Sequence, residues 1–167
     1  MQIRPFLDIL PSLYEHWGTT AMQPKTAEPF REILEKVEQP TTANFLQLLT
    51  SAAEYLEPGE VICEVGCWHG ANLIGVLVDR PDRLAYGVNF FSTQAEVAEN
   101  KIELLQGNLE TFGVAEQFCF SHQIIDDFLI SKTKITRCSS CPDKILENWI
   151  IITEIKTYII CVRTIRS

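Results

Sequence analysis

Hydrophobic positions in the first two thirds of the chain follow either a helical spacing or short continuous runs. A helix is predicted over residues 28–38, where Pro29 takes a favoured first-turn position and apolar residues recur on one side. Thr41 or Thr42 can cap a second predicted helix, whose apolar stripe extends to Leu56. The spacing therefore predicts two amphipathic helices, the second covering one face of a sheet.

Short apolar runs predict three strands. The first lies around Val61 and follows a Pro-Gly turn, the second covers residues 84–88, and the third covers residues 118–121. A helix is predicted between the last two strands, because Thr93 and Glu96 form a capping-box pattern. Gly113 is expected to end this helix, and its predicted apolar side consists of Val97, Leu104, Leu105, Leu109 and Phe112. Strands that alternate with helices predict an α/β fold.

The N-terminal residues 1–20 predict a broken helix between prolines. Tyr14, His16 and Trp17 could contribute to a lid over a ligand, but aromatic residues at this spacing more often anchor a helix on the core. A solitary histidine is more often a surface residue than a base. We therefore expect a structural role for this segment.

The most informative pattern is Glu64-x-Gly66-x-x-x-Gly70, which lies between the first predicted strand and a helix beginning near Leu73. Gly66 can adopt backbone angles that a side chain would forbid, and Gly70 lets the helix start pack closely on the strand. A dinucleotide loop would need a glycine where Trp68 stands. A phosphate would also be repelled by Glu64, whereas the ammonium and sulfonium of S-adenosylmethionine would be attracted. The carboxylate of that ligand could meet amides at the helix N-terminus.

This segment resembles the first motif of the class I S-adenosylmethionine-dependent methyltransferases, with Glu64, Gly66 and Gly70 at its defining positions. The resemblance spans about residues 40–130 and implies a Rossmann-like, mostly parallel sheet with flanking helices, S-adenosylmethionine as cofactor and a small-molecule acceptor. The family usually carries an acid at the end of the second strand, where this chain has Asn89. An amide there can accept one hydrogen bond and donate another to the ribose, without the strength of a carboxylate.

The resemblance also implies where the adenine would lie. Phe90 could pack beside the base or fill the edge of the sheet, and His122 and Gln123 end the third strand, where related enzymes read the adenine amino group. The full set of expected cofactor-binding residues is Glu64, Gly66, Cys67, Trp68, His69, Gly70, Asn89, Phe90, His122 and Gln123. No catalytic base is assigned, although His122 is a candidate, and Asp126 and Asp127 are expected to be a solvated helix start.

Composition limits the function further. The 167 residues suffice for one core, and the net charge of -8 disfavours nonspecific binding to nucleic acid or anionic membranes. No secretory pattern occurs at the N-terminus, so a cytoplasmic location is expected. Three of the six cysteines lie in or beside predicted core strands, and reduced buried thiols are the expected state. Cys138 and Cys141 have the spacing of half a zinc site, but no second such pair exists, and we expect no metal.

The final segment differs from the rest of the chain. Residues 131–167 carry 7 basic and 3 acidic side chains, whereas the preceding residues carry 7 and 19. One interpretation keeps the tail in the fold, with a helix over residues 143–147, strands over 149–153 and 158–162, and Glu154 near the ligand edge. The other holds that the native frame was lost near residue 130. The strand count favours it slightly, because three convincing strands and two doubtful ones fall short of the about seven strands of a class I methyltransferase sheet.

The expected organisation is an N-terminal helical segment over residues 1–40, a cofactor-binding core over 41–130 and an atypical tail over 131–167, which leaves the C-terminal side of the fold incomplete. The sequence therefore predicts an S-adenosylmethionine-dependent methyltransferase that acts on a small molecule. If the tail is aberrant, this enzyme is truncated. A noncatalytic cofactor-binding remnant and an NAD-dependent oxidoreductase of Rossmann type stay open as alternatives. The oligomeric state and the acceptor are not predicted.

Overall fold

The computed structural model describes residues 1–58, 60–89, 91–122, 145–154 and 157–165, with the backbone alone from residue 121 onward. The helices are α1 (Ile3–Leu13), α2 (Glu28–Lys36), α3 (Ala43–Glu54), α4 (Ala71–Leu77) and α5 (Ala95–Thr111), followed by the short 3-10 helix η1 (Ala115–Gln117). The strands are β1 (Tyr14–Glu15), β2 (Gln23–Pro24), β3 (Glu60–Val65), β4 (Ala85–Asn89), β5 (Phe118–His122), β6 (Ile145–Glu154) and β7 (Thr157–Ile165).

The main sheet has the order β5-β4-β3-β7-β6. β3, β4 and β5 are mutually parallel, and each is reached from the previous one through a helix, which confirms the predicted α/β class. The other side of β3 pairs with β7 in the antiparallel direction, from Glu60 opposite Arg163 to Val65 opposite Tyr158. The described sheet is therefore mixed. The antiparallel strand β7 lies beside β3, where a doubly wound sheet would have a parallel strand.

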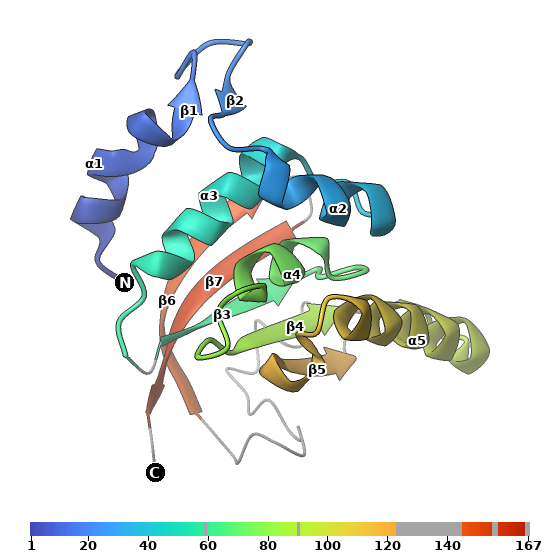
Figure 1. The fold of residues 1–167 in the computed structure, drawn as a ribbon. Helices are drawn as coiled ribbons and strands as arrows, with labels where there is room; N and C mark the ends of the chain where they lie inside the picture. Colours follow the sequence, from blue (N-terminus) through green and yellow to red (C-terminus); the bar gives the residue numbers. More distant parts are fainter. Residues whose placement is uncertain (59, 90, 123–144, 155–156, 166–167) are drawn as a thin grey trace.

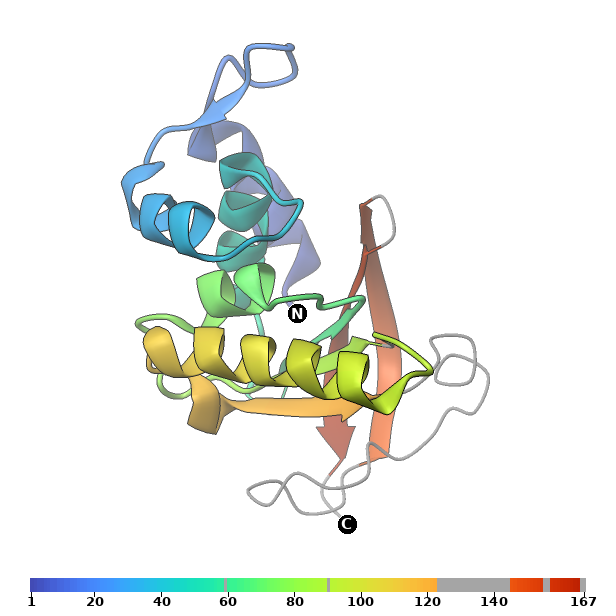
Figure 2. The same ribbon diagram turned by 90° about the vertical axis from the view of Figure 1, so that its right-hand side faces the viewer.

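α3 and α4 lie in front of the strands of the sheet in Figure 1, whereas α5 lies beside the ends of β4 and β5 and runs along β5 in Figure 2. Buried apolar side chains between these helices and the strands form the core, among them Ile33, Leu46, Leu49, Ile62, Leu73, Ile74, Leu77 and Leu105. The core is thus built by the helices that precede and follow the glycine loop.

The N-terminal segment packs beside α3, at the end of the molecule away from β5 (Figure 1). α1 contains Pro11 in its last turns, and the small hairpin of β1 and β2 follows it. Phe6 and Tyr14 are buried, and the Tyr14 hydroxyl donates to the carbonyl oxygen of Asn44 at 2.9 Å. Trp17 is 45% exposed, so Phe6 and Tyr14 anchor the segment and Trp17 does not.

α2 and α3 form where the apolar spacing predicts them. Thr42 is the N-cap of α3, and its hydroxyl accepts the amide hydrogen bond of Phe45 at 3.2 Å, which confirms one of the two expected caps. Leu34 of α2 is 37% exposed, although the helical spacing predicts it to be buried. The core lies nearer to Phe30 and Ile33, on the adjoining part of the helix surface.

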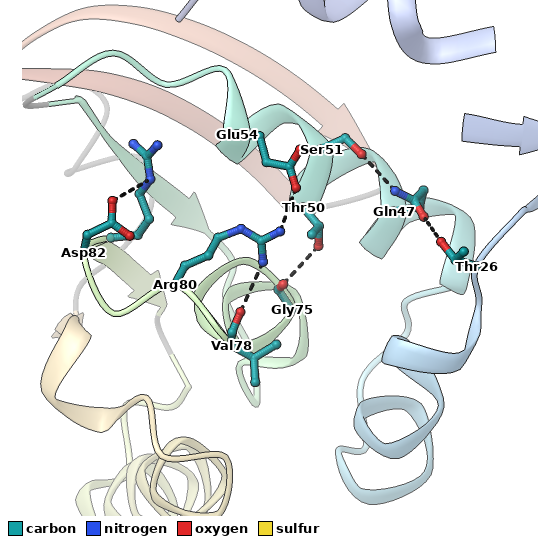
Figure 3. A network of polar contacts seen from close by, with 10 residues as sticks. Thr26, Gln47, Thr50, Ser51, Glu54, Gly75, Val78, Arg80 and Asp82 are labelled. Carbon is teal, nitrogen blue, oxygen red and sulfur yellow. Dashed lines mark hydrogen bonds and ion pairs between the residues drawn. The ribbon is translucent and has the colours of Figure 1, made fainter. Parts of the chain in front are cut away.

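α3 and α4 approach each other closely, as the polar contacts of Figure 3 show. The Thr50 hydroxyl donates to the carbonyl oxygen of Gly75 at 3.0 Å, and a Cβ at Gly75 would lie 2.9 Å from a methyl of Leu46. Arg80, just after α4, donates to Glu54 at 2.9 Å and to the Val78 carbonyl at 3.1 Å. These contacts hold α4 in position at the end of β3.

The predicted start and apolar side of α5 are wrong in detail. Its N-cap is Gln94, without a side-chain capping bond, so Thr93 does not form the expected capping box. Val97 and Leu104 are 41% and 43% exposed. The buried side of α5 consists of Ala98, Leu105 and Leu109. Tertiary packing selects a strip about one residue further along than the strongest apolar pattern indicates.

The tail contributes two strands to the sheet. β6 and β7 form an antiparallel pair that includes the predicted strands over residues 149–153 and 158–162. The helix expected over residues 143–147 is wrong for the described positions 145–147, which are already part of β6. Asp126, Asp127, Cys138 and Cys141, for which a role was considered, lie outside the described residues. Within the described part of the chain, no helix is both long and apolar enough to cross a membrane.

Candidate functional site

The candidate site is the loop over residues 66–70, at the carboxyl end of β3 and directly before α4. Gly66, Trp68 and Gly70 all have positive φ, at +88°, +45° and +90°. The Gly66 amide donates to the carbonyl oxygen of Val88 at 2.7 Å, which ties the loop to the end of β4. Two glycines thus permit a tight turn beside the neighbouring strand.

The absence of a side chain at Gly70 leaves space for a neighbour other than the expected strand. A Cβ at this position would lie 2.8 Å from a methyl of Leu105 in α5. The sequence pattern attributes the glycine to close packing of the helix start on the strand, but the close approach that the structure shows is to α5. Gly70 therefore lets the loop fit beneath α5.

Glu64 lies next to last in β3, and its side chain is fully buried. Its Oε1 accepts a hydrogen bond from the Asn72 amide at 2.7 Å, whereas its Oε2 has no partner among the described residues. Burial raises the pKa of this carboxyl to about 8, and the hydrogen bond from Asn72 opposes the rise. The site thus contains a carboxyl that is protonated at neutral pH and has one unsatisfied oxygen.

The segment over residues 38–41, after α2, forms one wall of the site. The Gln39 side-chain oxygen accepts the amide hydrogen bond of Ala71 at 2.9 Å, and the Thr41 hydroxyl donates to the Asn72 side-chain oxygen at 2.6 Å. Asn72 in turn donates to Glu64, so Thr41 orients the amide that holds the carboxyl. One amide of the α4 N-terminus is thus already bonded within the protein.

His69 and Trp68 lie side by side in the middle of the loop, with ring centroids 5.1 Å apart, but they differ in exposure. His69 is buried, and its Nδ1 lies 2.6 Å from the carbonyl oxygen of Glu38. A carbonyl only accepts, so Nδ1 donates, and Nε2 lies 3.5 Å from the Nζ of Lys101 in α5. Trp68 is 42% exposed, and the Lys101 Nζ lies 5.6 Å from its ring centroid. Its ring also lies 6.3 Å from that of Phe91.

Cys67 points into the core. It is fully buried, and a Cβ added at Gly87 would lie 2.8 Å from its sulfur and 2.5 Å from the Phe118 ring. Burial raises the pKa of the Cys67 thiol well above its ordinary value, and burial raises that of Cys63 to about 12. Both cysteines are therefore packing residues that stay protonated.

The remaining expected site residues follow β4 and β5. Asn89 ends β4 and is 5% exposed, and the register places it opposite His122 at the end of β5. Of His122 only the backbone is described, while Phe90 and Gln123 lie outside the described residues. The structure therefore brings the loop, Asn89 and the His122 backbone to one edge of the sheet, as parallel strand order requires.

Sequence reasoning missed several residues that contact the loop region, among them Gln39, Asn72, Lys101 and Asn108. A signal for Lys101 exists, because the positions three and four residues away from it are Val97, Ala98, Leu104 and Leu105. A lysine with only apolar neighbours on its helix face has no carboxylate there to pair with. No comparable signal identifies Gln39, which reaches the site from a loop.

Comparison of the chain with protein-family models, curated proteins and solved structures finds no match. Among the residues that the structure describes, no group of three or more His, Cys, Asp or Glu side chains could hold a metal ion. The candidate site is therefore characterised by its own geometry.

Proposed function

We propose that this chain is an S-adenosylmethionine-dependent methyltransferase acting on a small molecule, with a Rossmann-like arrangement of β3, β4 and β5. The observation that carries the proposal is the buried Glu64 carboxyl, whose Oε2 has no partner in the described part of the chain. It lies at the end of the strand that leads into the glycine loop. Ligands of open α/β sheets bind at that edge.

The residues around the glycine loop fit this cofactor better than they fit a dinucleotide. A pyrophosphate would raise the pKa of Glu64 further, so that only a neutral carboxyl would face it, and it would need space where Trp68 projects. A ligand with ammonium and sulfonium centres would instead favour ionisation of Glu64, because a nearby cation lowers the pKa of a carboxyl. In the structure Glu64 is closed to solvent, so a ligand can contact it only after the residues that cover it rearrange.

Four positions would hold the cofactor. Glu64 would pair with its cationic centres, Gly66 and Gly70 would allow its close approach to the loop, and Asn89 would hydrogen-bond the ribose. When bound, the cofactor supplies an electrophilic methyl group. The chain's own residues bind and orient it and exclude water, so that acceleration comes mainly from positioning.

The test is calorimetric titration of the full chain with S-adenosylmethionine, S-adenosylhomocysteine and NAD. We expect both adenosyl compounds to bind and NAD to bind more weakly. Glu64→Gln keeps the acceptor for Asn72 but cannot ionise beside a cationic ligand, and should weaken the binding of both adenosyl compounds about tenfold. Gly107→Ala is the matched control, since nothing lies within 4 Å of a Cβ there.

Gly66→Val tests the loop itself, because a branched side chain at φ +88° would be strained. Binding should be lost, with folding checked by circular dichroism. Preference of the wild-type chain for NAD would replace the proposal with an oxidoreductase. Binding of the adenosyl compounds without methyl transfer to any of a panel of hydroxyl and amine acceptors would overturn the enzymatic part and leave a noncatalytic cofactor-binding module.

A further inference from the structure

Lys101 carries a positive charge to the middle of the loop over residues 66–70. Its half-buried side chain extends from α5, and its Nζ lies 3.5 Å from His69 Nε2 and 5.6 Å from the Trp68 ring centroid. His69 can offer one lone pair at most, because its Nδ1 is engaged by Glu38. An ammonium has three donors, so these contacts leave capacity for another acceptor.

No carboxylate pairs with Lys101 in the part of the chain that the structure describes. The ion pairs found there join Met1 to Glu60, Arg31 to Glu28, Lys36 to Glu32, Arg80 to Glu54 and Arg83 to Asp82. Carboxylates outnumber cationic side chains in this protein, so a half-buried lysine without one is an unbalanced charge. A buried or half-buried cation is stabilised most by an anion beside it.

The loop therefore has an acidic side chain at its start and a cationic side chain against its middle. Glu64 is buried at its start, and Lys101 lies against its middle. An amino-acid group, with its ammonium and carboxylate, is complementary to this arrangement. The alternative anchor for the carboxylate is weakened, because the Ala71 amide at the start of α4 already bonds to Gln39.

We propose that Lys101 binds the carboxylate of the cofactor's amino-acid group, with the Trp68 indole beside it excluding water. The inference rests on the proposed function and adds a residue that the glycine motif does not contain. Lys101 then discriminates cofactors that carry a carboxylate from those that lack it. Its role is in binding, with no part in the methyl transfer itself.

The experiment compares S-adenosylhomocysteine with S-adenosyl-3-thiopropylamine, which lacks only the carboxylate, by calorimetric titration of the full chain. The wild-type protein should bind the carboxylate-bearing compound more tightly. In Lys101→Met the affinity for S-adenosylhomocysteine should fall about tenfold or more, while the affinity for the decarboxylated compound stays within about twofold. Lys101→Arg should retain most of the discrimination, because it keeps the charge.

Lys36→Met is the matched control. Lys36 also lies over an aromatic ring, 6.0 Å from the Phe112 centroid, but it pairs with Glu32 at 2.6 Å. Its substitution removes the same charge and should leave the ratio of the two affinities unchanged. An unchanged ratio in Lys101→Met would overturn the inference while the proposed function stands. Failure of the folded wild-type chain to bind either compound would instead overturn the proposed function.

Discussion

Individual side chains give this site its unusual chemistry. Glu64 is a carboxyl without exposure to solvent, held on one oxygen by Asn72, which is itself oriented by Thr41. A buried carboxyl is tolerated when it is protonated, because the neutral form avoids the cost of removing a charge from water. The sequence motif identifies the position of this acid, whereas its protonation results from burial in the folded chain, which the hydrogen bond from Asn72 opposes.

Glu64 should make stability depend on pH. Its pKa rises from 4.5 to about 8 on folding, so the folded chain holds a proton that the unfolded chain releases between these values. Its contribution to stability is fully present below pH 4.5 and is lost as the pH rises through about 8. Relative to Glu64→Gln, the wild-type free energy of unfolding should fall by on the order of a few kcal/mol over this range.

Urea unfolding of both proteins at several pH values between 4.5 and 8 measures this difference. The glutamine variant cannot ionise at this position, so all other titrating groups cancel in the comparison. Parallel pH profiles for the two proteins would show that Glu64 has an ordinary pKa in the folded chain.

Helices and strands show how far local patterns reach. α2 and α3 begin close to where prolines and threonines predict, because a first-turn proline and an N-cap act within a single turn. The start of α5 differs, since its capping pattern at Thr93 is present in the sequence but unused in the structure. The buried side of α5 likewise depends on Gly70, because the absence of a Cβ there lets Leu105 pack against the loop. A local pattern thus predicts that a helix forms more reliably than it predicts which residues pack against that helix.

The two threonines allow a direct test. Thr42→Ala removes the hydroxyl that accepts the Phe45 amide and should lower the free energy of unfolding by about 1 kcal/mol. Thr93→Ala should change it by less than about 0.5 kcal/mol, because the N-cap of α5 is Gln94. Denaturant unfolding of both variants measures the contrast, and equal losses would mean that the capping box at Thr93 forms in solution.

The architecture of the entire chain depends on what lies beside β3. The predicted strands β3, β4 and β5 form one half of the sheet, and the antiparallel pair of β6 and β7 completes the described sheet on the other side. A central strand needs hydrogen-bond partners on both edges. β7 provides them for β3, in the place where a doubly wound sheet would have a parallel strand.

Hydrogen exchange tests this arrangement. The amides of residues 159–162 in β7 should be protected to a similar degree as those of residues 61–64 in β3, because the two segments form one ladder. The exposed turn over residues 18–21 is the internal reference and should exchange rapidly. Exchange of the β7 amides at the rate of this turn would separate the tail from the sheet and support the hypothesis of a lost native frame after residue 130.

Apolar spacing and turn residues along the chain were enough to predict the α/β class, the three parallel strands, the presence of the four helices α2 to α5 and the glycine loop after β3. These features depend on interactions within a few residues, which the local sequence encodes. The direction of the strand beside β3, the Gln39 bond to α4, the unpaired oxygen of Glu64 and the position of Lys101 depend on contacts between distant segments. They follow from how the folded elements pack, because a periodic pattern specifies that a face is buried without specifying what covers it.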